Sequence, residues 1–201
     1  MDVVGISRIL TSADVEAAYR AGIFPMADPD HGVITWHQPK RRAILPLDSF
    51  HVSRSLSALL RRRPFEITFD RCFAAVMDAC AVRPSELGTW ISPEFKTIYR
   101  ELHRQGKAHA VEVWVDGELA GGLYGVSLGA AFFGESMFHY QRDASKVALV
   151  HLVNRLRERG YELLDTQAST SHLRRFGCID IRADEYMKRL KLALASKRTF
   201  V

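Results

Sequence analysis

Residues 121–138 read GGLYGVSLGAAFFGESMF, and the segment LDTQ at 164–167 follows them along the chain. The longer stretch predicts two strands in which five glycines are interleaved with large apolar side chains. Glycine weakens a strand, so it usually marks a bulge or a place where a ligand or another backbone comes close. Asp165 and Gln167 are two residues apart, and the two-residue period of a strand puts both side chains on one face. We therefore predict a functional site here, a pocket with a glycine-rich floor and an acid–amide pair beside it.

The segments around this stretch predict a mixed sheet. Residues 109–115 alternate apolar and polar, Asp116-Gly117 is typical of a type I′ hairpin, and strands at 118–126 and 130–138 complete a meander. A helix capped by Asp143 then runs to Gly160, and residues 162–167 return as a strand. Because strand–helix–strand crossovers are right-handed, this last strand should lie parallel to the one before the helix. The predicted fold class is α+β, with helices on the faces of the sheet.

The first half of the chain gives weaker signals. We expect helices at 12–21 (with a capping box at Thr11), 53–63, 70–82 (capped by Asp70) and from the Ser92 cap to Gly106, a strand at 65–69, and a last helix at 184–196. Residues 24–46 hold four prolines and predict a long loop with one short strand near 33–36. We expect residues 1–60 to form a small N-terminal lobe or arm, and residues 61–201 to form the main domain.

Composition excludes several classes of protein. No apolar run is long enough to span a bilayer, and the N-terminus lacks a secretory pattern. The three cysteines form no CxxC and predict buried thiols in a reducing compartment, so we expect a cytoplasmic protein. The eight histidines show no metal-ligand spacing, and we predict no metal and no cofactor. The net charge of +5 includes basic runs at 40–42 and 61–63, which favour a nucleic-acid surface over a merely solvated one.

Residues 125–129 fit the GxSxG pattern of serine hydrolases, with Asp165 and His172 following Ser127 in the chain. That pattern requires a helix directly after the serine. Here the next residues are Ala-Ala-Phe-Phe-Gly, which predict a strand. We therefore interpret Ser127 as a hairpin residue and keep the hydrolase as an alternative hypothesis.

Acyl transfer from coenzyme A is a second possibility. A meander followed by a strand–helix–strand crossover resembles the GNAT acetyltransferase fold. Those enzymes bind pyrophosphate at a glycine-containing turn before the helix. The corresponding residues here, 139–143, are HYQRD and contain no glycine. The GNAT-like scaffold therefore fits, while coenzyme A as a ligand does not.

A resemblance to a known family covers nearly the full chain. It is carried by these stretches: Gly22-Ile23-Phe24-Pro25; Trp36 with Pro39 and Arg42; Val52-Ser53-Arg54-Ser55; Gly88-Thr89-Trp90-Ile91; Val111-Glu112-Val113-Trp114; all of 121–138; Ala144-Ser145-Lys146; Leu164-Asp165-Thr166-Gln167; and His172-Leu173 with Gly177. In these stretches the chain closely resembles leucyl/phenylalanyl-tRNA–protein transferases, which share the GNAT-like core. The resemblance implies that residues 61–201 form a GNAT-like catalytic domain.

The resemblance also implies an activity. The family moves Leu or Phe, and also Met, from its tRNA to the α-amino group of a protein that begins with Arg or Lys, and thereby marks that protein for degradation. The aminoacyl ester is already activated, and positioning alone can supply on the order of 7–11 kcal/mol. Asp165, with an ordinary pKa near ~3.9, is a poor base for an amine. We therefore predict Asp165 and Gln167 as the catalytic pair, in which Asp165 holds the Gln167 amide and the Gln167 carbonyl accepts a hydrogen bond from the amine.

The remaining site residues follow from the chemistry of the two substrates and from the resemblance. The predicted pocket walls are Leu123, Phe132, Met137 and Leu149, and the predicted stacking platforms for the terminal adenosine are Trp36 and Trp90. Glu135 is predicted to face the cationic acceptor, or alternatively to fix the backbone or the ribose. The tRNA contacts implied by the resemblance are Arg54, Arg61 and Arg62.

Two positions depart from the family pattern. Met26 and Leu152 stand where a related chain carries aromatic residues, so stacking on the adenosine should be weaker here or differently shared. We expect a monomer, with Leu-tRNA, Phe-tRNA and the acceptor protein as its partners. A non-catalytic tRNA-binding module is the third hypothesis, and it predicts RNA binding with no transfer.

Overall fold

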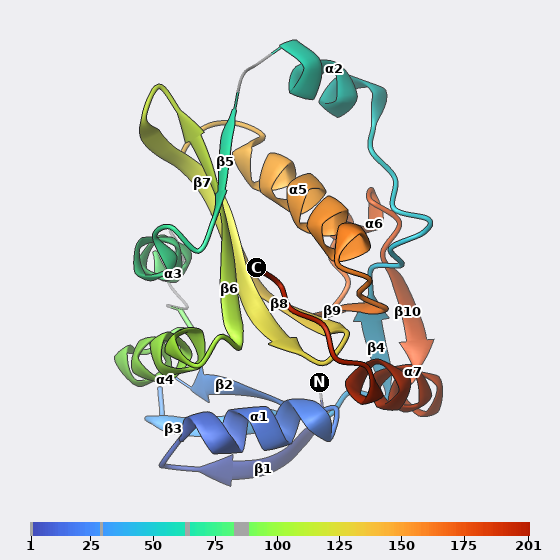
Figure 1. The fold of residues 1–201 in the computed structure, drawn as a ribbon. Helices are drawn as coiled ribbons and strands as arrows, with labels where there is room; N and C mark the ends of the chain where they lie inside the picture. Colours follow the sequence, from blue (N-terminus) through green and yellow to red (C-terminus); the bar gives the residue numbers. More distant parts are fainter. Residues whose placement is uncertain (1, 29, 63–64, 83–88) are drawn as a thin grey trace.

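The computed structural model describes residues 2–28, 30–62, 65–82 and 89–201 (Figure 1). The elements in this part of the chain are β1 (Val3–Ser7), α1 (Ser12–Arg20), β2 (Phe24–Asp28), β3 (Val33–His37), β4 (Arg41–Ile44), α2 (Arg54–Arg62), β5 (Glu66–Phe69), α3 (Phe73–Ala81), α4 (Pro93–Arg104), β6 (Ala108–Val115), β7 (Glu118–Leu128), β8 (Ala131–His139), α5 (Ala144–Glu158), β9 (Leu163–Gln167), α6 (Ser171–Arg174), β10 (Ile179–Arg182) and α7 (Ala183–Ala195). Residues 63 and 88, which the sequence analysis used, lie outside the described ranges.

The larger sheet confirms the predicted mixed topology. Its strand order in the described residues is β10-β4-β9-β8-β7-β6-β5. Strands β5 to β8 form an antiparallel meander, and β9 pairs with β8 in parallel after the crossover through α5. The β6–β7 hairpin turns at Asp116 and Gly117, whose positive φ values of 52° and 80° are those of the predicted type I′ turn. The predicted strand–helix–strand unit is therefore present.

Helices cover both faces of this sheet. Helix α5 lies on one face, where its Leu149, Leu152 and Leu156 are buried against Val111 and Val113 of β6. Helices α3, α4 and α7 cover the other face (Figure 1). The opposite orientations of alternate side chains in β6 and β7 divide the apolar core into two layers, one on each side of the sheet.

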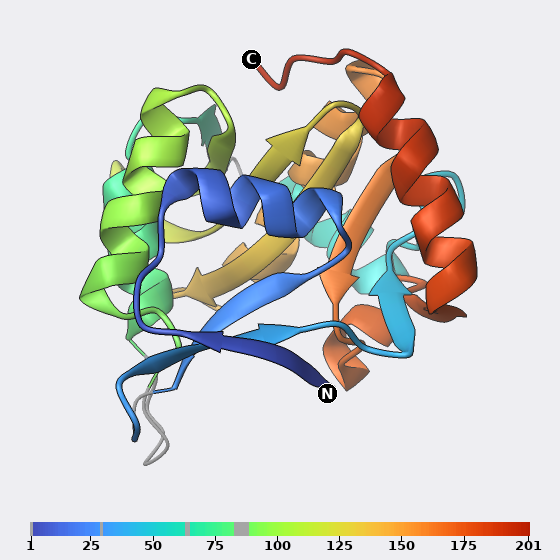
Figure 2. The same ribbon diagram turned by 90° about the horizontal axis from the view of Figure 1, so that it is seen from below.

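A second sheet, of order β1-β3-β2, lies at the N-terminal end together with α1. Helix α1 begins after Thr11, whose hydroxyl accepts from the Asp14 N–H while the Asp14 carboxylate accepts from the Thr11 N–H, as predicted. Figure 2 shows α1 lying between α4 and α7, and it contacts both. Helix α1 thereby packs against the core layer that α3, α4 and α7 cover.

The short strand predicted near 33–36 is confirmed as β3, but the prediction of a long loop over the rest of 24–46 is wrong. The segment contains β2, β3 and β4. Pro25 is compatible with β2 because this strand lies at the edge of the small sheet, where a missing N–H costs no pairing. Strand β4 pairs with β9 and β10, whose residues lie more than a hundred positions away, so no local hairpin signal announces it. β4 belongs to the larger sheet although it falls within residues 1–60, and the domain boundary near 60 stays a prediction.

Two local predictions also need correction. Helix α3 begins at Phe73 after Cys72 and not after Asp70. The Asp70 carboxylate instead accepts from the Ala110 N–H at 2.8 Å and lies 2.7 Å from His109 Nδ1. Strand β7 continues through Ser127 to Leu128, so the turn falls at Gly129 and Ala130. Strand β10 and helix α6 were not predicted.

None of the described helices is long and apolar enough to cross a membrane. Within the described ranges, no three His, Cys, Asp or Glu side chains gather in a way that could hold a metal ion.

Candidate active site

A pocket of about 400 Å³ opens where the small sheet meets strands β8 and β9 and helix α5. Its walls are mostly apolar, and polar groups lie in the middle of β8, at Glu135 and Ser136, and at the end of β9, at Thr166 and Gln167. The lining residues are Phe24, Pro25, Met26, Trp90, Leu123, Tyr124, Gly134, Glu135, Ser136, Met137, Leu149, Leu152, Leu164, Thr166, Gln167, Ala168, Thr170, His172 and Leu173. A concave apolar site with a few convergent polar groups is typical of small-ligand binding.

Six predicted site residues line this pocket. They are Trp90, Leu123, Glu135, Met137, Leu149 and Gln167. They come from β7, β8, β9, α5 and the segment before α4, so the fold brings together residues that are far apart in the sequence.

Three other predicted residues do not line the pocket. Phe132 is fully buried and stacks on Phe200, with ring centroids 5.4 Å apart, because it lies toward the opposite end of β8 from Met137. Trp36 lies on β3, and its indole N–H donates to the Ser7 hydroxyl at 3.0 Å. Asp165 is completely enclosed beneath the pocket.

The predicted glycine-rich pocket floor is also only partly correct. Of the glycines in 121–138, Gly134 alone is among the pocket-lining residues that the structure describes. A Cβ atom on Gly125 would lie 2.2 Å from the Phe133 carbonyl oxygen, and one on Gly121 would lie 2.6 Å from the Ala144 Cβ. These two glycines therefore allow close packing of strand on strand and of strand on helix α5.

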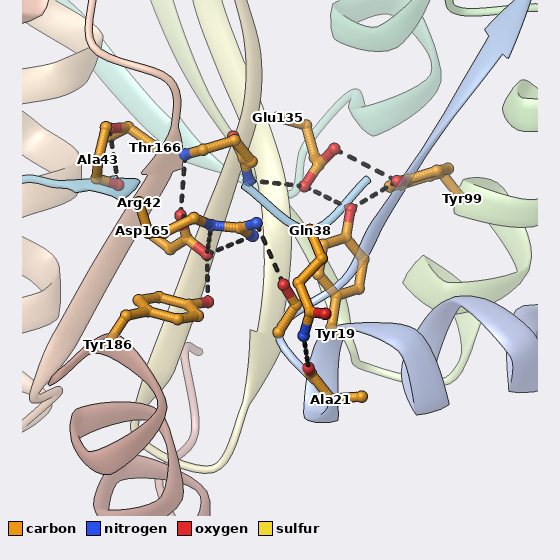
Figure 3. Close-up of polar contacts among 12 residues, drawn as sticks. Tyr19, Ala21, Gln38, Arg42, Ala43, Tyr99, Glu135, Asp165, Thr166 and Tyr186 are labelled. Atoms are coloured by element: carbon orange, nitrogen blue, oxygen red, sulfur yellow. Dashed lines mark hydrogen bonds and ion pairs between the residues drawn. The ribbon is translucent and has the colours of Figure 1, made fainter. Parts of the chain in front are cut away.

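Asp165 makes a buried ion pair with Arg42 (Figure 3). Arg42 Nε lies 2.9 Å from Oδ1 and 3.0 Å from Oδ2, and Nη2 donates to Oδ2 at 2.7 Å. The Tyr186 hydroxyl of α7 donates to Oδ2 at 2.5 Å. Oδ1 also accepts the main-chain N–H of Gln167 at 2.8 Å. Asp165 thus holds the Gln167 backbone, which corrects the prediction that it holds the Gln167 side-chain amide.

Arg42 was predicted as part of a basic surface, and this is wrong. Its side chain is 1% exposed. The guanidinium packs over the rings of Phe24, at 4.5 Å, and Tyr186, at 5.0 Å, and Nη1 donates to the Gly22 carbonyl at 3.3 Å. The stack and the bonds tie β4, β9, α7 and the start of β2 together behind the pocket.

Gln167 ends β9 in the left-handed region, with φ of 56°. A non-glycine residue there is strained, and such residues cluster at functional sites. One orientation of its amide puts Nε2 at 3.4 Å from Glu135 Oε1. Turned over, Nε2 donates to the carbonyl oxygens of Gly134 at 2.8 Å and Thr166 at 3.1 Å. We adopt the second orientation because its two bonds are shorter, and it leaves the Oε1 atom as the acceptor that faces Glu135.

Glu135 on β8 joins the pocket to two buried tyrosines (Figure 3). The Tyr19 hydroxyl donates to Oε1 at 2.6 Å, the Tyr99 hydroxyl lies 3.3 Å from Oε2, and the two hydroxyls are 2.7 Å apart. Glu135 is only partly exposed and lines the pocket, and its carboxyl group contacts both tyrosine hydroxyls. Burial raises the pKa of Glu135 to about 7, against the opposing effect of the Tyr19 hydrogen bond.

The predicted tRNA-binding residues Arg54, Arg61 and Arg62 lie on α2, and all three are exposed. Leu56 on the same helix is buried against the α5 side of the core. Helix α2 is thus amphipathic and presents a basic outer face apart from the pocket lining.

The arrangement does not support a serine hydrolase. Ser127 is a strand residue whose hydroxyl lies 2.6 Å from the Tyr161 hydroxyl. Asp165 is ion-paired with Arg42, and His172 lies on α6 in the pocket wall. The described Ser127 partners include neither of the other two triad candidates.

Several residues at or behind the pocket were not predicted as site residues. Tyr19, Tyr99 and Tyr186 contact Glu135 or Asp165 and are single tyrosines on the inner faces of helices, where a core role is the ordinary interpretation. His172, which lines the pocket, was named only as a triad candidate and within a stretch of the family resemblance. Met26 and Leu152 do line the pocket, as their departure from the family pattern indicated.

Comparisons with known proteins now define the class. The family model described as leucyl/phenylalanyl-tRNA protein transferase matches residues 44–191, and the model of that family's N-terminal domain matches residues 9–40. The leucyl/phenylalanyl-tRNA–protein transferase of Salinibacter ruber (strain DSM 13855 / M31) is 54% identical over 177 residues, which is 88% of this chain and 77% of the relative. That of Chlorobaculum parvum (strain DSM 263 / NCIMB 8327) is 51% identical over 189 residues, 94% of this chain and 97% of the relative.

Among solved structures, a ribosomal-protein-alanine N-acetyltransferase from Brucella melitensis biovar Abortus 2308 aligns with a TM-score of 0.41 and 17% identity, over 54% of this chain and 82% of the other. The sequence matches show that the protein is an aminoacyltransferase, an enzyme that uses aminoacyl-tRNA and a protein as its substrates. The chain belongs to the leucyl/phenylalanyl-tRNA–protein transferase family.

Proposed function

We propose that this enzyme transfers Leu or Phe, and also Met, from tRNA to the α-amino group of proteins whose first residue is Arg or Lys. The observation that carries the proposal is an apolar pocket that ends at the Gln167 amide and the Glu135 carboxyl group. The apolar walls suit the aminoacyl side chain, and the polar end suits the reacting ester and amine. We further propose that it acts as a monomer in the cytoplasm, where both substrates occur.

The aminoacyl side chain would lie among Leu123, Met137 and Leu149. All three line the pocket, and they come from β7, β8 and α5. Such a wall offers dispersion and burial but no hydrogen bond, so it accepts Leu, Phe and the unbranched Met side chain and gives no partner to a polar one. The pocket therefore selects the amino acid.

The terminal adenosine would stack on Trp90. This indole lines the pocket and is braced edge-on by Phe95, with ring centroids 5.6 Å apart. Base–aromatic stacking contributes about 1–3 kcal/mol per base. Since Trp36 lies outside the pocket and position 26 is Met, the adenosine has one tryptophan platform among the described pocket residues, with Met26 on the β2 side.

Gln167 would bind the attacking amine through its Oε1 atom. The Gly134 and Thr166 carbonyl oxygens hold its Nε2, and Asp165 holds its main-chain N–H. Asp165, enclosed and fully bonded, acts through Gln167 as a positioning residue. Holding two reactants in the right geometry is the main requirement here, because the ester is already activated.

The basic face of α2 would contact the tRNA backbone through Arg54, Arg61 and Arg62. Phosphate contacts position a nucleic acid without reading its sequence. In this arrangement α2 binds the tRNA backbone, and the pocket selects the amino acid.

The acceptor N-terminus brings an α-amino group and, in Arg or Lys, a second cation. Among the described pocket-lining residues, Glu135 is the acidic one, so the polar end of the pocket is suited to the acceptor's α-amino group.

Transfer of labelled amino acid tests the proposal. Phe-tRNA and Leu-tRNA, each labelled in the amino acid, are incubated with the protein and with matched peptides that begin with Arg, Lys or Ala. We expect labelled peptide from the Arg and Lys acceptors and none from Ala. The Gln167→Ala variant should bind tRNA as the wild type does and transfer far more slowly. Absence of transfer to every acceptor, with charged tRNA still intact, would refute the proposal and leave a tRNA-binding module.

A further inference from the structure

A buried carboxyl group borders the reaction centre without an assigned role. Glu135 lines the pocket beside Gln167, and its Oε1 lies 3.4 Å from the terminal amide atom of Gln167 that faces it. A carboxylate has about four acceptor positions. The hydroxyls of Tyr19 and Tyr99 occupy two, which leaves room for a further donor on the pocket side.

Asp165 lacks such room. Its two oxygens receive three contacts from Arg42, one from Tyr186 and one from the Gln167 main chain. It is also 0% exposed. A substrate atom could reach it only by breaking the ion pair, so the acid of the predicted catalytic pair is not available to take a proton.

We infer that Glu135 is the catalytic residue that accepts the proton of the attacking α-amino group and returns it to the leaving ribose oxygen. This inference rests on the proposed function and assigns the proton transfer to a named atom pair. A neutral amine has two N–H groups, one for Gln167 Oε1 and one for the Glu135 carboxylate. The two acceptors lie side by side at the end of the pocket where the ester must lie.

Atoms and electrons balance in this step. The amine nitrogen attacks the ester carbonyl carbon, a C–N bond forms, and the carbonyl π pair moves to oxygen. Glu135 takes the extra proton from nitrogen. When the carbonyl re-forms, the bond from carbon to the ribose oxygen breaks, and that oxygen takes the proton from Glu135. The products are an amide and a free ribose hydroxyl, and Glu135 is again a carboxylate.

The electrostatic surroundings suit this role. The groups that face Glu135 are Tyr19 of α1, Tyr99 of α4, Asp165 and Gln167 of β9, and Arg42 of β4. The pKa of Glu135 is raised to about 7, because burial and the Asp165 charge raise it by more than the hydrogen bonds of Tyr19 and Tyr99 and the Arg42 charge lower it. An α-amino group titrates at roughly 7.7–8.0, so donor and acceptor are closely matched, which is the condition for efficient general-base catalysis.

The test is the pH dependence of single-turnover transfer from labelled Phe-tRNA to an Arg-initiated peptide. In the wild type, the rate should rise with pH through the titration of Glu135. General-base catalysis contributes about 10²–10⁴-fold, so Glu135→Gln should lower the rate at saturating acceptor by at least about a hundredfold and leave only the rise that comes from titration of the acceptor amine, at roughly 7.7–8.0. Glu112→Gln is the matched control, because Glu112 is a fully buried carboxylate that bonds Thr68 and Cys72 outside the pocket.

Two further readouts separate catalysis from recognition. Tyr19→Phe removes a hydrogen-bond donor that lowers the pKa of Glu135. The part of the pH–rate profile that Glu135 causes should therefore shift to higher pH. The part that the acceptor amine causes should stay where it is. We compare the transfer rates for peptides that begin with Arg and with its neutral isostere citrulline. The ratio of these two rates should be the same in Glu135→Gln as in the wild type. Recovery of the Glu135→Ala rate by added formate would support the assignment further.

The inference fails if Glu135→Gln transfers within about tenfold of the wild type, if Tyr19→Phe leaves the pH dependence of the rate unchanged, or if Glu135→Gln loses the preference of Arg over citrulline while the rate at saturating acceptor is kept. That last result would make Glu135 the reader of the acceptor side chain. A wild type that transfers nothing would instead refute the proposed function itself, so the two failures are distinguishable.

Discussion

Replacing Asp165 with Asn removes one charge from the buried ion pair while keeping the size of the side chain. Arg42 and Asp165 are 1% and 0% exposed, so water cannot compensate the guanidinium that remains. The new amide would also turn N–H groups toward the N–H groups of Arg42. Removing one partner of a buried pair costs about 3–5 kcal/mol. Because the Asn carbonyl can still accept from Tyr186 or Gln167, we expect the lower end of that range.

Urea unfolding measures this loss directly. A domain is stable by about 5–15 kcal/mol in total, so a loss of about 3 kcal/mol should lower the unfolding midpoint clearly. In a double-mutant cycle, Arg42→Met combined with Asp165→Asn should be less destabilised than the sum of the two single variants, since no unpaired charge remains. It should not regain full stability, because the one carbonyl oxygen of Asn replaces only one of the two carboxylate oxygens that accept from the Tyr186 hydroxyl and the Gln167 N–H.

The Asp165→Asn single variant should transfer slowly while binding tRNA normally, because Tyr186 and the strained Gln167 backbone then compete for one carbonyl oxygen. A stability loss below about 1 kcal/mol, a value typical of exposed pairs, would refute the argument. It would mean that the pair is hydrated in solution and that Asp165 does not hold Gln167 in place.

Three further predictions concern the pocket, the tRNA and pH. Leu149→Trp should fill the pocket and abolish transfer without weakening the binding of uncharged tRNA in a filter assay, since overpacking acts where the side chain lies. Arg61→Ala combined with Arg62→Ala should lower the slope of log affinity against log salt by about 1–2 and leave transfer from a minimal aminoacyl-adenosine donor unchanged. The raised pKa of Glu135 means that its carboxylate costs stability once pH rises from 4.5 through about 7. Thermal unfolding should therefore show Glu135→Gln more stable than the wild type at pH 8, on the order of 3 kcal/mol, and nearly equal to it at pH 4.

The parts of the fold that the sequence predicts are those that short-range signals specify. Asp116-Gly117 sets the β6–β7 hairpin, and the apolar stripe of α5 with its end at Gly160 defines the crossover to β9. Strands β4 and β10 carry no such signal, because their pairing closes a loop of more than a hundred residues. Only the assembled sheet shows that residues 41–44 are a strand.

The residues of the candidate site also fall into those that the sequence predicts and those that it does not. Leu123, Met137 and Leu149 follow from apolar periodicity and from the family resemblance. The tyrosines around Glu135 and Asp165 come from three separate helices, and a single buried tyrosine looks like ordinary core in any of them. Arg42 was misinterpreted because it stands in a run of three basic residues, whereas the alternation of β4 turns it inward and leaves Arg41 exposed.

We propose that one pocket holds the aminoacyl group against Gln167 and Glu135. A crystal structure with an amide-linked 3′-phenylalanylamino-adenosine, which cannot be hydrolysed or transferred, would show whether it does. We expect the phenyl ring among the apolar side chains of β7, β8 and α5, the adenine on Trp90, and the amide carbonyl within reach of Gln167. Density for the analogue elsewhere, or a Gln167 side chain turned away from it, would show that the acyl group binds at another site.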